Sequence, residues 1–326
     1  MAIERPVIIA TRGSPLALAQ ANLVAAECRA AFPQLAFELK IIKTTGDKLQ
    51  TASLTKAGET LPKGLFTKEL EVALLAGEAD LAVHSLKDLP TDLPAGLKLA
   101  ATPLRADVRD VLVYRADGST RRGFKPQTQL KDLPAGATIA TSSTRRKMQL
   151  LAARPDLNIV EIRGNVSTRL EKVVRQGELD ATVLALAGLT RLDFLIQPDG
   201  TLTGNAVPTG LLATTLGLTE MLPCVGQGAI GIEIREHDED LENICHRINH
   251  ADTFHGVTAE RAFLQAMGGG CLSPVAAHGE IHGEKISLHA VSFHDGSEKR
   301  AKGERSIAQA ANLGIELAEK LKPVGK

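Results

Sequence analysis

Val7-Ile8-Ile9-Ala10-Thr11 is a short apolar run rich in β-branched residues, and Ser14-Pro15 follows it after two residues. β-Branched residues favour strands, whereas a serine before a proline at the first helical position is typical of a helix start. The stretch therefore predicts a strand followed by a helix over 16–32, which ends before Pro33. A strand that leads into a helix is the repeating unit of α/β folds.

The same order of strand and helix returns along most of the chain. It predicts largely parallel sheets whose faces are covered by helices. The tail differs, because 275–301 alternates apolar and polar residues between glycine turns, which predicts an antiparallel sheet closed by a helix over 306–321. We expect two α/β domains and a smaller α+β domain, and we find no convincing internal repeat. Further strands are predicted at 37–43, 80–85, 138–141, 158–162 and 181–185, and further helices at 67–77, 143–153, 166–176 and after 185.

Composition restricts the possible functions. The 38 basic residues balance the 38 acidic ones, so no overall field draws this chain of 326 residues to nucleic acid or membrane. Trp is absent and there is one Tyr, which leaves few platforms for stacking bases. No stretch approaches the roughly 18 apolar residues of a membrane span, and the N-terminus lacks the apolar core of a signal peptide. We expect a cytoplasmic protein without nucleic acid or membrane partners.

Arginines gather where the predicted strands end. Between Thr141 and Arg169, six basic residues stand against two acidic ones. Open α/β sheets bind ligands at the carboxyl ends of their strands, helix N-termini favour anions, and arginine forks match carboxylates. A single arginine is more simply a solvated surface side chain, but the repeated placement predicts a cleft for a ligand with several carboxylates or phosphates. The arginines concerned are Arg12, Arg145, Arg146, Arg163 and Arg169.

A second candidate feature is His84-Ser85-Leu86-Lys87-Asp88-Leu89-Pro90, in which a predicted strand leads into a loop stiffened by proline. The loop carries a base, Lys87, beside an acid, Asp88. A carboxylate at a strand end can stabilise a developing cation or shuttle protons. A simple polar turn with an exposed Lys–Asp pair explains the residues about equally well.

The third candidate is Cys271, which follows Gly268-Gly269-Gly270. The glycines leave the thiol uncrowded, and a thiolate is a strong nucleophile in basic surroundings. By itself, a cysteine is more simply a small buried hydrophobe. The four cysteines (Cys28, Cys224, Cys245 and Cys271) are far apart and form no CxxC pair, so we expect free thiols in a reducing compartment.

Two further patterns are weaker than they first look. Gly226-Gln227-Gly228-Ala229-Ile230-Gly231 matches GxGxxG, but the residues after it alternate like a strand, and a dinucleotide site requires a helix there. Cys245, His246, His250 and His255 fit no metal-ligand template, so we expect a polar helix face and no metal.

Eight ordered blocks of sequence resemble the porphobilinogen deaminase (hydroxymethylbilane synthase) family over most of the chain. So many blocks in one order are highly specific. They are Thr11-Arg12-Gly13-Ser14-Pro15-Leu16-Ala17, Lys63-Gly64-Leu65-Phe66-Thr67-Lys68-Glu69-Leu70-Glu71, His84 to Pro90, Thr141-Ser142-Ser143-Thr144-Arg145-Arg146, Arg163-Gly164-Asn165-Val166 with Thr168-Arg169-Leu170, Ala187-Gly188-Leu189 with Arg191, Val225-Gly226-Gln227-Gly228-Ala229, and Gly269-Gly270-Cys271.

The resemblance implies a transferase of tetrapyrrole biosynthesis that condenses four porphobilinogen units head to tail, releases ammonia at each step and gives hydroxymethylbilane. The family builds this product on a dipyrromethane cofactor held by a cysteine thioether, and Cys271 matches that cysteine. Each pyrrole carries an acetate and a propionate, which accounts for an arginine-lined cleft in a chain of zero net charge. Asp88 matches the catalytic carboxylate that faces the pyrrole nitrogens and stabilises an azafulvene-like cation.

The resemblance also assigns roles to other residues of the chain. Lys56 and Lys63 match lysines in or beside a mobile loop, and the length and glycines of 46–62 independently predict a mobile lid. The remaining matches divide into cofactor-binding positions (Lys87, Ser143, Arg145, Arg146, Arg163 and Arg169) and substrate-binding positions (Arg12, Ser14, Gln20 and Arg191).

The expected fold is two doubly wound, periplasmic-binding-protein-like domains plus a small α+β C-terminal domain. The expected boundaries are 1–103 with 228–245 for the first domain, 109–222 for the arginine-rich second and 250–326 for the third, which carries Cys271. The resemblance further implies a monomer that passes its product to uroporphyrinogen-III synthase.

The sequence departs from the family pattern at a few positions. Ala140 stands where glycine often precedes the Thr-Ser-Ser block, and Leu272-Ser273 replaces Gln-Val. Neither change removes a chemical group that the mechanism needs. Two other functions fit the residues less well. A non-catalytic anion-binding protein leaves Asp88 and Cys271 without a role, and a phosphate-handling transferase needs a P-loop or metal carboxylates that the sequence lacks.

Overall fold

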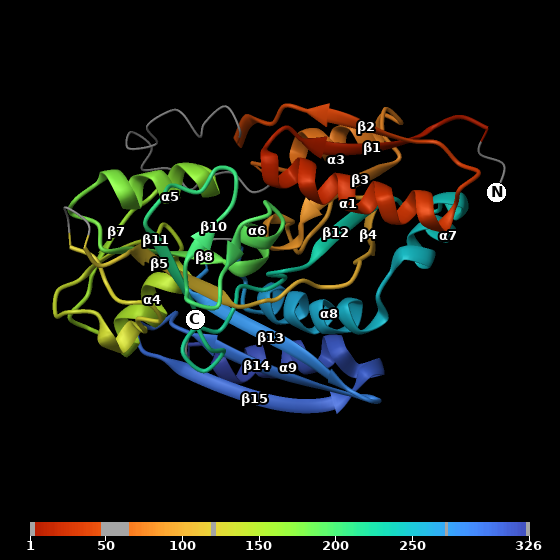
Figure 1. Ribbon diagram of the computed structural model, residues 1–326. Helices are drawn as coiled ribbons and strands as arrows, with labels where there is room; N and C mark the ends of the chain where they lie inside the picture. The colour runs from red at the N-terminus through yellow and green to blue at the C-terminus, as the bar shows by residue number, and fades with distance from the viewer. Residues whose placement is uncertain (1–3, 47–64, 119–121, 271–272, 324–326) are drawn as a thin grey trace.

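Figure 1 shows the arrangement of the chain in the computed structural model, which describes residues 4–46, 65–118, 122–270 and 273–323. In these residues, two five-stranded sheets carry helices, and a three-stranded sheet packs against α8 and α9. The predicted fold class, two doubly wound α/β units plus a small α+β unit, is confirmed. None of the described helices has the length and apolar character needed to cross a membrane.

The predicted strands and helices of the α/β part are present within a few residues of their expected ends. The strands are β1 Val7–Arg12, β2 Phe37–Ile42, β3 Leu81–Ser85, β4 Leu97–Ala101, β5 Asp110–Arg115, β6 Thr138–Ala140, β7 Asn158–Val160, β8 Ala181–Ala185, β9 Leu195–Ile196, β10 Leu202–Thr203, β11 Leu211–Thr215, β12 Ile230–Arg235, β13 Val275–His282, β14 Lys285–Ser292 and β15 Lys299–Ser306. The helices are α1 Pro15–Ala31, α3 Lys68–Leu75, α4 Thr144–Ala153, α5 Val166–Arg175, α6 Leu186–Thr190, α7 Glu239–Ile248, α8 Ala251–Ala266 and α9 Ala310–Leu321, with 3₁₀ turns η2 Leu86–Asp88, η3 Leu130–Asp132 and η4 Ile307–Gln309.

The two large sheets have the same design. The first sheet has the order β2-β1-β3-β12-β4, and the second has the order β7-β6-β8-β5-β11. In each, one strand runs against the others: β12 is antiparallel to β3 and β4, and β5 is antiparallel to β8 and β11. The prediction of largely parallel sheets is right for the remaining strands and missed these two.

Both antiparallel strands begin where the chain has just crossed from one sheet to the other. Residues 102–109, the first crossover, lead from β4 to β5, and residues 216–229, the second crossover, lead from β11 to β12. The first sheet is thus completed by β12, which follows the second sheet in the chain, whereas the strands of the second sheet all come from the continuous segment 110–215. The prediction that a strand, and not the helix of a dinucleotide site, follows the GxGxxG match is confirmed, because residues 230–235 form strand β12.

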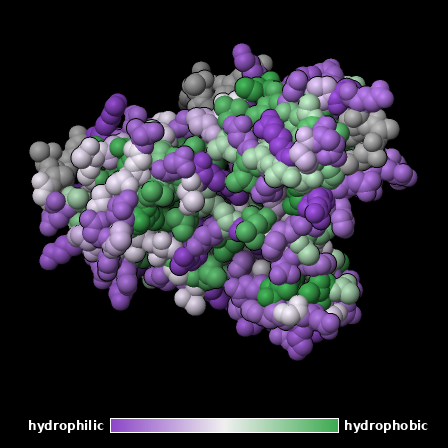
Figure 2. Space-filling view, turned by 45° about the vertical axis from the view of Figure 1, so that its right-hand side comes forward, coloured by the Kyte–Doolittle hydropathy of each residue, from purple (hydrophilic) through white to green (hydrophobic). Residues whose placement is uncertain are grey.

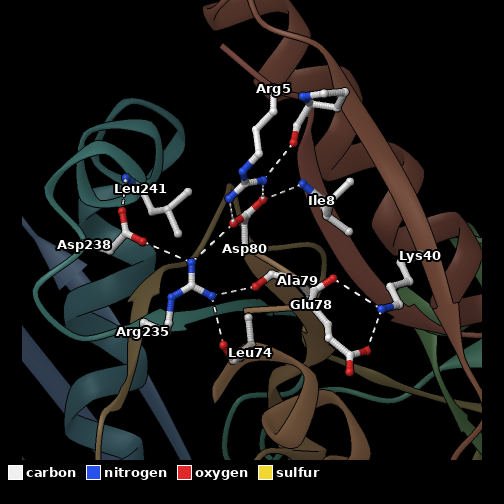
Figure 3. A network of polar contacts seen from close by, with 11 residues as sticks. Arg5, Ile8, Lys40, Leu74, Glu78, Ala79, Asp80, Arg235, Asp238 and Leu241 are labelled. Atoms are coloured by element: carbon white, nitrogen blue, oxygen red, sulfur yellow. Dashed lines mark hydrogen bonds and ion pairs between the residues drawn. The ribbon is translucent and has the colours of Figure 1, made fainter. Parts of the chain in front are cut away.

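An internal repeat that the sequence does not reveal is present in the structure. Asp80, just before β3, accepts a hydrogen bond from the Ile8 amide at 2.9 Å and a two-pronged one from Arg5, as Figure 3 shows. Asp180, just before β8, accepts a hydrogen bond from the Thr138 amide at 2.8 Å and pairs with Arg122. Each aspartate ties two neighbouring strands at the end of the sheet opposite to the candidate site.

The third sheet, β13-β14-β15, is antiparallel, as predicted for the tail. Its apolar face packs on α8 and α9, and the helix predicted from 306 begins at Ala310 after the turn η4. Figure 2 shows that the outer surface on one side of the molecule is mainly hydrophilic, with separate smaller hydrophobic areas. The core clusters lie between each sheet and its helices.

Two glycines let the crossovers approach their neighbours closely. Gly226 has φ +72°, and a Cβ there would lie 3.2 Å from the Leu86 carbonyl carbon in η2. Gly228 has φ +81°, and a Cβ would lie 2.5 Å from the Ala106 carbonyl oxygen in the first crossover. Because only glycine fits both the positive φ and the contact, the motif Gly226-Gln227-Gly228 is explained by the joining of the crossovers to each other and to η2.

The predicted domain boundaries stay a prediction. The first sheet includes β12, and the core around it includes α7 residues up to Ile248, beyond the expected boundary at 245. Some predicted features lie outside the described residues: Cys271, Lys56, Lys63 and residues 47–62 of the expected lid.

Candidate active site

The loop after β3 is held by its apolar residues and presents its polar ones. Leu86 and Leu89 are buried and pack with Ala229 and Val257, which anchors η2 to the second crossover and to α8. The Leu86 amide also donates to the Ala229 carbonyl at 3.1 Å. Between these anchors, Lys87 and Asp88 are half-buried. The predicted loop is therefore a fixed 3₁₀ turn.

Cations on helices α4 and α5 influence the charged residues of this turn electrostatically. Burial lowers the pKa of Lys87, with Asp88 opposing the shift and Arg146 adding to it. Burial also lowers the pKa of Arg169 to about 10, again with Arg146 adding and Asp88 opposing. These mutual effects place Lys87, Asp88, Arg146 and Arg169 in one electrostatic neighbourhood, although the first two follow β3 and the last two lie on α4 and α5.

Asp110 is the anion opposite the first turn of α4, a functional residue that was not predicted from the sequence. Its Oδ2 lies 2.8 Å from Nη2 of Arg145, and its Oδ1 lies 2.8 Å from Nη2 of Arg146. Burial would raise the pKa of Asp110, but the two guanidinium groups overcome burial and hold that pKa well below its usual range. An acidic residue at the first position of β5 carries no distinctive sequence signal, because its partners are remote in the sequence.

Arg145 and Arg146 are therefore buried residues rather than an open cleft wall. Arg145 donates to the Leu222 carbonyl at 2.7 Å, and Arg146 donates to the Val183 carbonyl at 2.8 Å. Both are less than a tenth exposed. The two cations at this helix N-terminus oppose the helix dipole, and the chain's own Asp110 supplies the compensating anion.

Two predicted site serines cap helices. Ser14 Oγ accepts a hydrogen bond from the Ala17 amide at 3.3 Å, and Ser143 Oγ accepts one from the Arg146 amide at 3.4 Å. The predicted helix start at Ser14-Pro15 is confirmed. Each serine stands at the carboxyl end of a parallel strand, β1 or β6, in corresponding places of the two sheets.

Gln20 links α1 to the end of β3. Its Oε1 accepts a hydrogen bond from Ser85 Oγ at 3.0 Å, three residues before Asp88 in the sequence. Its Nε2 is buried and makes no hydrogen bond with any described residue. A buried amide without a partner is costly, so this group is suited to a polar group of a ligand.

The remaining predicted arginines lie around the same edge in different settings. The Arg12 guanidinium lies 4.3 Å from the ring centre of Phe66. Arg163 is exposed and lies 3.4 Å from the Glu161 carboxylate. Arg191 donates to the Gly228 carbonyl at 2.6 Å, and burial lowers the pKa of Arg191 to about 10.

Cys224 lies near the charged cluster of Lys87, Asp88, Arg145 and Arg146, a position that was not predicted from the sequence. Burial raises its pKa, while Arg145 and Lys87 act in the opposite direction. Cys28 and Cys245 are buried in the first core, and burial raises the pKa of Cys28 to about 12. Of the three described cysteines, Cys224 is the one that is partly exposed. Among the described residues, no group of three His, Cys, Asp or Glu side chains is placed to hold a metal ion.

The comparisons with known proteins agree over nearly the whole chain. The family model "Porphobilinogen deaminase, dipyromethane cofactor binding domain" matches residues 7–243, and "Porphobilinogen deaminase, C-terminal domain" matches residues 254–323. Porphobilinogen deaminases of Syntrophus aciditrophicus and Thermus thermophilus are 44% and 43% identical to it, each over 96% of this chain and 94% of the relative. The solved methionine binding protein MetQ has a TM-score of 0.39 and 13% identity over 78% of this chain and 92% of that one. The two family models and the full-length relatives show that the chain belongs to the porphobilinogen deaminase family.

Proposed function

We propose that Asp88 is the catalytic carboxylate of this enzyme. The enzyme condenses four porphobilinogen units head to tail, releases ammonia and gives hydroxymethylbilane on a dipyrromethane cofactor. The observation that carries the proposal is the position of Asp88, half-buried at the end of β3 among Lys87, Arg146 and Arg169. Because the carboxylate of Asp110 is already paired with Arg145 and Arg146, Asp88 is the partly exposed carboxylate beside these cations, which suits a site that receives anionic substrates yet must stabilise one positive charge.

The chemistry requires that positive charge to be stabilised. The bond between the exocyclic carbon of porphobilinogen and its protonated amine breaks, and ammonia leaves with the bonding electron pair. The positive charge then spreads over the pyrrole ring and the exocyclic carbon. A fixed carboxylate stabilises this charge more in the transition state than in the ground state, which is the condition for accelerating the step. After the new carbon–carbon bond forms, the attacked ring loses a proton, and the Asp88 carboxylate is suited to accept it.

The described residues fit the carboxylate-rich cofactor. When bound, the dipyrromethane supplies the pyrrole carbon on which the product grows. Lys87, Arg146 and Arg169 would hold its carboxylates, since cations and arginine forks match such groups. Arg145, Arg163 and Ser143 complete the proposed cofactor set, with Arg145 acting through the shared Asp110 contact.

We assign the substrate contacts to Arg12, Ser14, Gln20 and Arg191. The Nε2 of Gln20 supports this assignment most directly, because it is buried beside the end of β3 and has no hydrogen-bond partner among the described residues. Arg12 and Ser14 lie at the end of the neighbouring strand β1. Lys56 and Lys63 are proposed for the loop that precedes α3, on the family resemblance alone.

Cys271 is the proposed attachment site. Its described neighbours form a turn just after α8, where the Gly270 amide donates to Ser273 Oγ at 3.0 Å and the Ser273 amide donates to the Gly270 carbonyl at 2.9 Å. The proposed third domain, 250–326, thus carries the cofactor, while 1–103 with 228–245 and 109–222 supply the residues around Asp88. We further propose a cytoplasmic monomer that passes its product to uroporphyrinogen-III synthase.

Intact mass followed by peptide mapping tests the attachment site. We expect an adduct of two pyrrole units on the Cys271 peptide, and a folded Cys271→Ser protein without it, because a serine hydroxyl is a far poorer nucleophile. Cys224→Ser is the matched control, since Cys224 is the described cysteine beside the cluster. An adduct that maps to Cys224, or that survives in Cys271→Ser, contradicts the assignment.

A further inference from the structure

A cavity of about 330 Å³ lies between the third sheet and the residues that follow β11. Leu218 and Leu222 of the second crossover line one side, and the exposed face of the sheet lines the other. Leu222 also packs on Val291 of β14, while its carbonyl accepts the hydrogen bond from Arg145. The cavity is thus separate from the cluster around Asp88 but adjoins the segment that holds Arg145.

The register of the third sheet brings basic side chains together in this cavity. His278, His289 and Lys302 stand side by side on β13, β14 and β15, and Arg300 follows in the next row on the same face. Side chains alternate between the two faces of a strand, and the neighbouring Ala277, Leu288 and Ala301 pack towards α8 and α9. All four basic residues line the cavity.

Two charged side chains of the cavity wall, Arg300 and Glu280, have a partner in the structure. Arg300 Nε is paired with Glu298 at 2.5 Å, and Nε2 of His278 lies 3.4 Å from Oε1 of Glu280, a further lining residue. Lys302 has no carboxylate within ion-pair distance in the part of the chain that the structure describes. The cavity therefore has a cation at its exposed rim, imidazoles further in, and leucine side chains opposite.

We propose that this cavity binds a small organic carboxylate, with its apolar body against Leu218 and Leu222 and its carboxylate between His289 and Lys302. The volume lies at the small end of the range for ligand pockets, roughly 300–1,000 Å³. An apolar wall with a few polar groups on one side is the usual composition of such pockets. This site goes beyond the proposed function and does not depend on it.

Burial lowers the pKa of His289, and Lys302 and His278 add to the shift while Glu280 opposes it. A neutral imidazole can donate one N–H to a carboxylate, and the ammonium of Lys302 supplies the charge. The proposed ligand would also lie near the buried ion pair of Glu260 with Arg105, since Nδ1 of His278 is 3.4 Å from Oε1 of Glu260.

Titration of the holoenzyme with phenylacetate tests the site, with the imidazole carbon-bound protons of His278 and His289 followed by NMR. We expect saturable shifts at both histidines, and no matching effect of 2-phenylethanol, which has the apolar body without the charge. Lys302→Met should weaken phenylacetate binding about tenfold, the size of a lost charge-assisted contact. Lys320→Met, on the exposed side of α9, should leave binding unchanged. Absence of saturable shifts, or equal affinity in Lys302→Met, overturns the proposal.

A second arm identifies the source of the carboxylate. Porphobilinogen, which carries an acetate and a propionate, replaces phenylacetate in cofactor-loaded Asp88→Asn protein, where the proposed function predicts slow consumption. Shifts at His289 that disappear with an added Lys302→Met change identify the substrate as a ligand of this cavity. Shifts with phenylacetate but not with porphobilinogen identify an unrelated carboxylate. Because the readout is binding at His289, its outcome is distinguishable from a failure of the role of Asp88.

Discussion

Arg105 and Glu260 tie the first crossover to α8 through two parallel hydrogen bonds, Nη1 to Oε1 at 2.7 Å and Nη2 to Oε2 at 2.9 Å. Glu260 is fully buried. It also accepts hydrogen bonds from the Gly226 amide of the second crossover at 2.7 Å and from the Gly279 amide of β13 at 2.9 Å. One carboxylate therefore joins both crossovers to the third sheet.

Loss of this carboxylate should destabilise the whole fold. Glu260→Gln leaves the Arg105 guanidinium without its counterion in a largely buried setting, so we expect the free energy of unfolding in urea to fall by about 3–5 kcal/mol. Glu316→Gln is the control, because Glu316 pairs with Arg305 and Lys320 on the exposed side of α9. A similar loss in both variants would show that the buried position of Glu260 confers no special stability.

The same pair predicts how stability depends on pH. Burial would raise the pKa of Glu260, but Arg105 and His278 outweigh burial and lower the pKa from 4.5 to about 2. A lowered folded-state pKa stabilises the fold above pH 4.5, and this stabilisation disappears as the pH falls from 4.5 towards about 2. Glu260→Gln should therefore show a shallower loss of unfolding free energy over this range in acid titrations. Equal slopes in the two proteins would contradict the prediction.

Asp110 should matter for stability more than for direct contact with ligand. Asp110→Asn leaves the buried Arg145 and Arg146 facing each other without their anion, and we expect a loss of about 3–5 kcal/mol in urea unfolding. Asp107→Asn is the control, because Asp107 pairs with Arg109 in a much more exposed position. If Asp110→Asn loses no more unfolding free energy than Asp107→Asn, the two arginines are neutralised by something other than Asp110.

Substitution of the predicted cofactor arginines should affect stability according to how deeply each side chain is buried. Arg163→Leu should impair loading of the dipyrromethane, measured as adduct by intact mass, with little change in unfolding, because Arg163 is exposed. Arg145→Leu should impair loading and also lower stability, because it removes a buried ion pair and the hydrogen bond to Leu222. Unchanged adduct in Arg163→Leu would remove this residue from the site.

What could be predicted from the sequence was mainly local. Ser14 before Pro15 gives the first helix start, and β-branched runs give the strands, because capping and backbone preference act within a few residues. Lys87 and Asp88 were found because they adjoin such a strand. The antiparallel direction of β5 and β12 could not be predicted, since their pairing depends on crossovers that join remote parts of the chain.

The missed residues have the same physical cause. Asp110 and Glu260 are ordinary acidic residues in the sequence, and their importance comes from partners such as Arg146 and Arg105, which are 36 and 155 positions away. The repeat marked by Asp80 and Asp180 is likewise a likeness of position without a likeness of sequence. Family resemblance supplied the roles that local patterns could not.

Turnover of porphobilinogen by Asp88→Asn, measured in cofactor-loaded protein whose adduct is verified by intact mass, tests the central claim most directly. Asparagine keeps the size and hydrogen bonding of aspartate but removes the charge that would stabilise the developing cation. We predict a loss of two to four orders of magnitude, or roughly 3–5 kcal/mol in the barrier, with Asp88→Glu retaining more activity because its charge survives. Turnover of Asp88→Asn near the wild-type rate would contradict the account and place the catalytic carboxylate elsewhere.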